Sequence, residues 1–90
     1  MTRRKYETVN EVWEVAYIIR DKLATAGESQ AANDLTETLD SFWTTSSEAL
    51  VELLDTFDEI KHVCNETLSK EDRSLRDDML KGATRLLNLR

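Results

Sequence analysis

Hydrophobic residues recur at intervals of three and four along four stretches of the chain, which is the spacing of one face of an α-helix. This spacing predicts helices over residues 6–26, 29–43, 46–65 and 70–88. Each helix is amphipathic and is expected to turn its hydrophobic face toward a shared core. The expected core residues are Val9, Val12, Trp13, Ala16, Ile19 and Leu23 in the first helix, Ala31, Ala32, Leu35, Leu39 and Phe42 in the second, Leu50, Leu53, Leu54, Phe57, Ile60 and Cys64 in the third, and Leu75, Met79, Ala83 and Leu86 in the fourth.

Three of the helix boundaries carry recognisable signals. Gly27 follows the first helix, where a left-handed residue is wanted and glycine adopts that conformation without steric cost. Thr45 followed three residues later by Glu48 matches the capping box that starts a helix. Ser69 is a suitable N-cap for the last helix.

Composition supports an all-α fold, because the chain of 90 residues has no proline and only two glycines. Four helices joined by short loops predict a small four-helix bundle, either up-down or a compact orthogonal variant. Gly82, inside the last helix, predicts a close contact with another helix. Neither a repeat nor a linker divides the sequence, so residues 1–90 are expected to form a single domain.

The remaining composition points to a cytoplasmic protein. The basic start of the chain is not followed by an apolar run of signal-peptide length, and no stretch approaches the length of a membrane span. A single cysteine, Cys64, cannot form an internal disulfide, and its place on an apolar helix face predicts a buried structural thiol. We therefore expect no interaction with membranes.

Charge is strongly segregated along the chain, whose net charge is −6. Residues 1–6 sum to +3, residues 7–59 to −11 and residues 60–90 to +2. Between Lys22 and Lys61 there are nine acidic residues and no lysine or arginine. The middle of the protein is thus expected to project a negative potential.

The acidic residues of the third predicted helix form one stripe. At about 100° per residue, Glu48, Glu52, Asp55 and Glu59 fall within about 60° of one another and opposite the hydrophobic face. Like charges three and four residues apart disfavour the helix by a few tenths of a kcal/mol per pair. One interpretation is a solvated face that keeps the protein soluble, and the other is a docking site for a basic partner surface.

Ile18 is the second candidate contact residue. It projects on the polar side of the first predicted helix, among acidic residues. Single exposed hydrophobic residues are common on protein surfaces, so Ile18 either has no special role or contacts a partner or a second copy of the chain.

The residues needed for catalysis or metal binding are scarce. His62 is the only histidine, and Cys64 lies two positions away, about 200° around the same helix. Glu59 and His62 form one Glu-x-x-His step, but a di-iron site needs a second. With only Gly27 and Gly82 there is no glycine-rich phosphate loop. We expect no enzymatic activity, no metal and no cofactor.

Direct nucleic-acid binding is also not expected, because the second and third helices contain no cation before Lys61. A basic end could be formed only by Arg3, Arg4, Lys5, Arg73, Arg76, Lys81, Arg85 and Arg90. The aromatic residues Trp13, Tyr17, Phe42 and Trp43 are interpreted as core, with Trp43 partly exposed.

These observations favour a non-enzymatic protein-binding module that docks by its acidic helical face on a basic partner surface. As a class, a compact helical domain with such a face resembles small bacterial and phage proteins that inhibit toxins or nucleases, which implies an immunity or inhibitor protein or a nucleic-acid mimic. The alternative is a structural or assembly subunit that forms a homodimer through its first helix, with Ile18, Val15 and neighbouring aromatic residues at the contact.

Overall fold

The chain folds into five α-helices. The computed structural model describes residues 6–89, and in that range the helices are α1 (Val9–Thr25), α2 (Ser29–Asp40), α3 (Ser46–Glu59), α4 (Lys61–Thr67) and α5 (Lys70–Asn88). No strand occurs between residues 6 and 89, so the predicted all-α class is confirmed. None of these helices is both long enough and apolar enough to cross a membrane.

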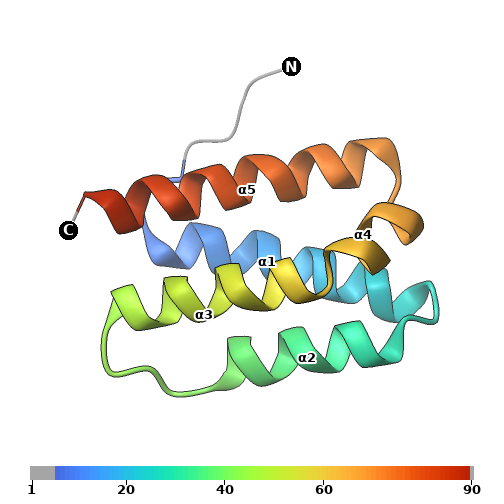
Figure 1. The fold of residues 1–90 in the computed structure, drawn as a ribbon, viewed down its shortest axis with the longest axis horizontal. Coiled ribbons are helices and arrows are strands. Elements are labelled where there is room, and N and C mark those ends of the chain that lie inside the picture. Colours follow the sequence, from blue (N-terminus) through green and yellow to red (C-terminus); the bar gives the residue numbers. More distant parts are fainter. Residues whose placement is uncertain (1–5, 90) are drawn as a thin grey trace.

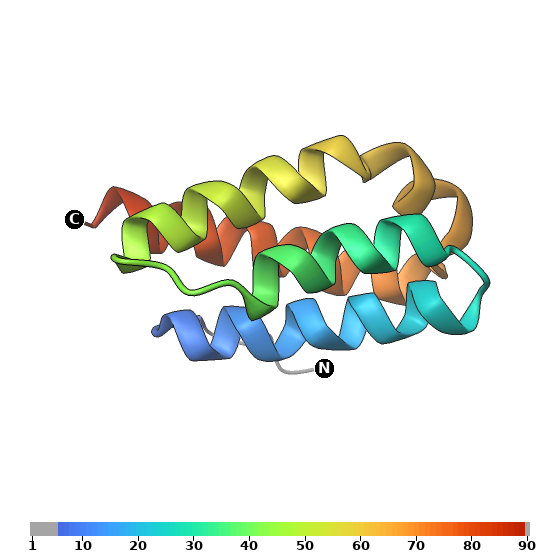
Figure 2. The same ribbon diagram turned by 90° about the horizontal axis from the view of Figure 1, so that it is seen from below.

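The four long helices run back and forth along one direction (Figure 1). α1 packs against α2 and α5, and α3 packs against the same two helices. Figure 2 shows α2 between α1 and α3, so that α1 and α3 lie on opposite sides of the molecule. Each helix therefore has two long neighbours and leaves one side to the solvent.

The predicted helix over residues 46–65 is divided at Ile60, which is why there are five helices and not four. Ile60 has φ −97° and ψ 7°, away from helical values, and α4 continues from Lys61 in a new direction (Figure 1). Ile60, Cys64 and Leu68 are all buried. The change of direction keeps these three side chains in the core while the chain turns toward α5.

Three helix ends follow the predicted signals. Gly27 has φ +88°. The amide groups of Gly27 and Glu28 donate to the carbonyl oxygens of Ala24 (3.1 Å) and Leu23 (2.9 Å), which is the Schellman pattern. Thr45 and Ser69 are N-caps whose hydroxyl groups accept from backbone amides three residues later.

The first helix begins at Val9 and not at residue 6. Thr8 is its N-cap and forms a full capping box with Glu11, because each side chain accepts a hydrogen bond from the other residue's backbone amide, at 3.3 Å from Glu11 N and 3.1 Å from Thr8 N. At Thr45 only half of this arrangement is present, since only the threonine hydroxyl accepts a hydrogen bond.

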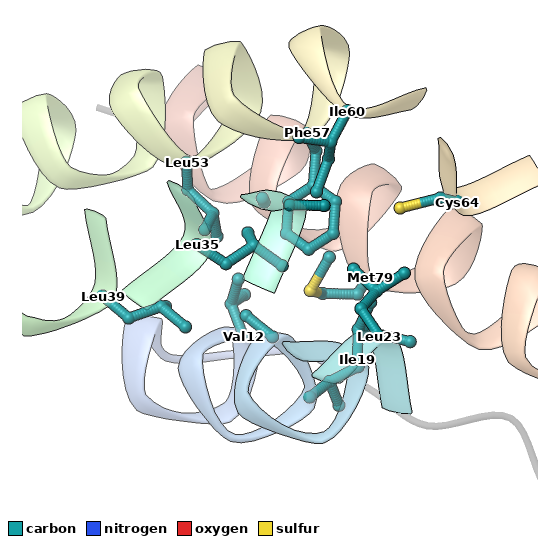
Figure 3. Close-up of a cluster of buried hydrophobic side chains, with 14 of the residues drawn as sticks. Val12, Ile19, Leu23, Leu35, Leu39, Leu53, Phe57, Ile60, Cys64 and Met79 are labelled. Carbon is teal, nitrogen blue, oxygen red and sulfur yellow. The ribbon is translucent and has the colours of Figure 1, made fainter. Parts of the chain in front are cut away.

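One hydrophobic core joins all five helices (Figure 3). Side chains of α1, α2, α3 and α5 meet there, and Cys64 of α4 closes one end. The largest fully buried side chains are Phe57, Ile19, Leu23, Leu35, Leu50, Leu53 and Met79.

Gly82 permits a close contact, but its neighbour is the segment before α1 and not another helix. Tyr6 is buried, and a Cβ atom added at Gly82 would lie 2.6 Å from both Cβ and Cγ of Tyr6. Arg85 holds the same segment, since its Nη2 donates to the carbonyl oxygen of Tyr6 at 2.6 Å. The prediction that Gly82 contacts another helix is therefore wrong, because its close neighbour is Tyr6.

Candidate functional site

The four acidic residues predicted to form a stripe lie on the exposed face of α3. Glu48, Glu52, Asp55 and Glu59 are all exposed, whereas Leu50, Leu53 and Phe57, on the other side of the helix, are buried. The helix starts at the Thr45 cap and keeps its register to Glu59, which places one carboxylate on each turn. Over 11 residues the stripe extends about 16 Å along the helix axis.

None of the four carboxylates has a hydrogen-bond or ion-pair partner within residues 6–89. The cause is the sequence of the neighbouring elements, because α2, α3 and their connection contain no lysine, arginine or histidine. Some cations elsewhere in the described chain do pair with acids. Lys22 of α1, for example, lies 3.5 Å from Asp72 of α5.

α2, which packs against α3, carries three acids. Asp34 accepts a hydrogen bond from Gln30 at 3.0 Å, and Asp40 accepts one from the Tyr17 hydroxyl at 2.6 Å. Glu37 is exposed and its side chain has no partner among residues 6–89. We call Glu37 together with the four α3 acids the acidic face.

The hydrogen bond between the Tyr17 hydroxyl and Asp40 connects α1 to α2. The hydrogen bond to Asp40 raises the pKa of Tyr17 above its usual value of 10.0, with smaller contributions from burial and from the charge of Asp40. The Arg20 guanidinium, whose carbon lies 4.8 Å from the Tyr17 ring centroid, opposes this pKa shift.

Ile18, the other predicted contact residue, does not join the acidic face. It is 38% exposed on α1, and it lines an open groove of about 560 Å³ with Leu68 and the Lys22 and Asp72 ion pair. α1 packs against α2 and α5 and lies opposite α3 (Figure 2). Val15 is fully buried, so it cannot take part in the dimer contact proposed for it.

Two exposed hydrophobic residues, one in α3 and one in the connection before it, were missed by the sequence reasoning. Val51 is 42% exposed, and on a helix it falls between Glu48 and Asp55, three residues from one and four from the other. At about 100° per residue Val51 lies about 40° outside the arc of the stripe, next to Asp55, so it borders the stripe.

Phe42 is the larger discrepancy, because it was assigned to the core and is 96% exposed. The reason is that α2 ends at Asp40. Ser41 adopts an extended conformation with φ −72° and ψ 151°, and Phe42 lies in the connection 41–45. The helical spacing that placed it beside Leu39 does not apply there.

Both tryptophan side chains donate hydrogen bonds to the C-terminal end of α2. Trp43 Nε1 donates to the Thr38 carbonyl oxygen at 2.9 Å, and Trp13 Nε1 donates to that of Leu39 at 3.1 Å. These carbonyl groups lie in the last turn of α2, where helical partners are missing. The prediction that Trp43 is partly exposed is confirmed, since it is half-buried.

The reactive residue types are placed as structural groups. Cys64 is fully buried, and burial raises the pKa of its thiol although nearby Arg76 opposes the shift. Arg76 was assigned to a basic end, but it is only 6% exposed. It is buried because its guanidinium donates to Asn65 Oδ1 at 2.6 Å and to Asp77 Oδ1 at 2.8 Å.

His62 is exposed and lies 3.3 Å from Glu66, one turn along α4. Within residues 6–89 no group of three or more His, Cys, Asp or Glu residues is arranged to hold a metal ion. Of the predicted basic end, Arg3, Arg4, Lys5 and Arg90 lie outside the described residues.

No protein-family model matches the chain, and comparisons with curated proteins and with solved structures likewise gave no match. Any function of the acidic face must therefore be inferred from its own residues.

Proposed function

We propose that this protein is a non-enzymatic binding module that docks by its acidic face on the basic surface of another protein. The observation that carries the proposal is the row of four exposed carboxylates on α3 that have no partner among residues 6–89, in a region between Lys22 and Lys61 that contains no lysine or arginine. Charges that are not neutralised within the protein remain available to a partner, and they speed its association.

Repulsion within the stripe also destabilises α3, and α2, α3 and their connection contain no cation to offset it. Its three successive like-charge pairs, from Glu48 to Glu52, to Asp55 and to Glu59, together disfavour α3 by roughly 1 kcal/mol at low salt. A solvated face needs acids, but it does not need them on every turn of one helix without an interspersed lysine. A docking role accounts for both the spacing and the missing cations.

The partner class that fits best is a protein whose cleft is built for phosphate, so the module acts as an inhibitor or immunity protein. Successive carboxylates of the stripe lie about 5.5 Å apart along the axis, compared with about 3.4 Å for the phosphates of one DNA strand. The stripe thus imitates a nucleic acid in its charge and regular spacing, at lower density. The predicted cytoplasmic location accords with such a target.

A homodimer is the alternative, and its proposed contact has lost support. With Val15 buried and the Tyr17 hydroxyl bound to Asp40, the exposed hydrophobic surface of α1 at that contact is reduced to Ile18. A mass measurement in solution at high micromolar concentration tests this alternative directly.

The decisive experiment reverses charges inside and outside the acidic face. The protein is used to capture partners from a lysate of its source cells, and the affinity of the purified partner is then measured at low and moderate salt. The test variant is Glu52→Lys, Asp55→Lys, and the matched control is Asp21→Lys, Glu66→Lys, whose acids are exposed on α1 and α4. Each pair changes the net charge by +4, from −6 to −2.

We expect the test variant to bind at least about tenfold more weakly and with a shallower salt dependence, and the control to bind almost as wild type does. Equal affinities for wild type and the test variant, with both folded by circular dichroism, would falsify the docking role. Equal weakening in both variants would show that net charge, and not the acidic face, governs binding.

A further inference from the structure

Phe42 is the most exposed large hydrophobic residue of the described chain. It is 96% exposed, against 73% for Leu89 near the end of the chain and 42% for Val51. It lies in the connection 41–45 between α2 and α3, the two helices that carry the acidic face (Figure 1). Its position therefore links an apolar group to the charged surface.

The backbone on both sides of Phe42 is held in place. On one side, the Ser41 hydroxyl donates to the carbonyl oxygen of Glu37. On the other side, Trp43 donates to the Thr38 carbonyl oxygen at 2.9 Å, and Thr45 caps α3. A phenyl ring presented by a fixed backbone loses little conformational entropy when it is buried by a partner.

The charged residues nearest to Phe42 in the sequence are all negative: Glu37 and Asp40 before it and Glu48 after it. A second copy of this chain would bring the same acids against them, which costs free energy. A partner with lysine or arginine residues around an apolar pocket would meet both the ring and the acids. Interfaces commonly combine a central aromatic side chain with a charged rim.

We propose that Phe42 is the apolar anchor of the docking surface and that it inserts into an apolar pocket flanked by basic residues on the partner protein. This inference rests on the proposed function, because the acids that flank Phe42 in the sequence define the partner's charge. The acidic face then supplies the association rate, and Phe42 supplies most of the lifetime of the complex.

The test uses two cationic probes that differ in apolar content. One is a synthetic amphipathic peptide of leucine and lysine, and the other is polylysine. Binding of each probe is measured by calorimetry to wild type, to Phe42→Ala, to Leu89→Ala as an exposed apolar control, and to Glu52→Lys, Asp55→Lys. Since Phe42 and Leu89 are exposed, both alanine variants should unfold at the same denaturant concentration as wild type.

We expect Phe42→Ala to raise the Kd for the leucine and lysine peptide about tenfold and to leave polylysine binding unchanged. Leu89→Ala should change neither. If Phe42→Ala leaves the peptide Kd unchanged, or if Leu89→Ala raises it equally, the anchor role is overturned. A wild-type dimer that Phe42→Ala converts to a monomer would also overturn it, because the occupant would be a second copy.

The charge-reversed variant separates this inference from the proposed function. If Glu52→Lys, Asp55→Lys binds polylysine as tightly as wild type does, the docking role of the acidic face fails whatever Phe42 does. If the charge-reversed variant binds neither probe while Phe42→Ala binds both as wild type does, the docking role of the acidic face is supported and only the anchor role of Phe42 is rejected.

Discussion

The α2 and α3 pair and the α1 and α5 pair balance their charges in different ways. α1 and α5 carry both signs, and several of their charged groups pair within the protein, as Lys22 does with Asp72 and Arg76 does with Asp77. α2 and α3 carry acids alone, and most of these point outward without partners in the described chain. The half of the molecule formed by α1 and α5 therefore pairs several of its own charges, whereas most acids of the half formed by α2 and α3 have no partner among residues 6–89.

The two pairs also differ in how they are joined. Along α5, Gly82 packs closely against the buried ring of Tyr6, in the segment that precedes α1. Between α2 and α3 a buried hydrogen bond contributes, since the Thr38 and Thr56 hydroxyl oxygens lie 2.7 Å apart. α2 and α3 are therefore joined by contacts in the interior, without ion pairs between them in the described chain.

The close packing beside α5 can be broken by a single methyl group. Gly82→Ala should lower the free energy of unfolding by about 1–3 kcal/mol, because the new Cβ would lie 2.6 Å from the Tyr6 ring. The loss exceeds the gain of about 1 kcal/mol in helix propensity. Urea unfolding followed by circular dichroism measures the difference.

The control for Gly82→Ala is a double-mutant cycle with Tyr6→Gly, which removes the contacting atoms. In that background Gly82→Ala should be neutral or stabilising. A cost that persists without the Tyr6 side chain would mean that the contact has been wrongly identified.

The buried hydroxyl pair tests how α2 and α3 are joined. The Thr56 hydroxyl donates to the Glu52 carbonyl oxygen at 2.8 Å, so Thr38 is the donor between the two helices. Thr38→Val should therefore cost about 1 kcal/mol of unfolding free energy. Thr36→Val is the matched control, because the Thr36 hydroxyl bonds only within its own helix, to the Ala32 carbonyl oxygen. Equal losses of unfolding free energy in both variants would show that the hydrogen bond between the two helices does not stabilise the protein.

Neutralising one acid in each half should change stability in opposite directions. Glu52→Gln removes two repulsive pairs and should stabilise the protein by about 0.4–1 kcal/mol at low salt. Asp72→Asn loses the contact with Lys22 and a negative charge in the first turn of α5, and should destabilise it by about 0.3–1 kcal/mol. Thermal unfolding at low and high salt checks both values, and the gain from Glu52→Gln should disappear at high salt. The same sign for both substitutions would abolish the contrast between the halves.

The smallest expected effect concerns the hydrogen bond between Tyr17 of α1 and Asp40 of α2. Because the hydrogen bond to Asp40 raises the pKa of Tyr17 above 10.0, its stabilisation is complete below about pH 10 and is lost as the pH rises through the higher, folded-state value. Wild type should therefore lose stability relative to Tyr17→Phe above pH 10 and not below it. A constant difference from pH 8 to pH 11 would contradict this coupling.

Much of the fold and of the candidate site could be predicted from local patterns. The α3 stripe depends only on helical spacing, and Gly27, Thr45 and Ser69 mark helix ends through interactions within a few residues. The start of α1 was missed although Thr8 and Glu11 fit the same capping pattern that was recognised at Thr45. That signal was present in the sequence and was overlooked.

The end of α2 could not be predicted in this way. Phe42 continues the hydrophobic spacing of the helix, but α2 ends at Asp40, and the Leu39 carbonyl oxygen in its last turn accepts a hydrogen bond from the Trp13 indole, 26 residues away. Arg76 was similarly misassigned, because its burial depends on Asn65 of another helix. Residues whose environment is set by distant partners give no local signal.

By itself, the sequence determined the all-helical class, the capped helix ends and the acidic stripe, because each depends on interactions within one or two helical turns. Only the tertiary structure decided that Phe42 is exposed, that Val15 and Arg76 are buried, and that Ile18 lies apart from the stripe. These outcomes depend on how the helices pack and on hydrogen bonds between residues far apart in the chain. Such packing selects one of several faces that the helical period alone leaves equivalent.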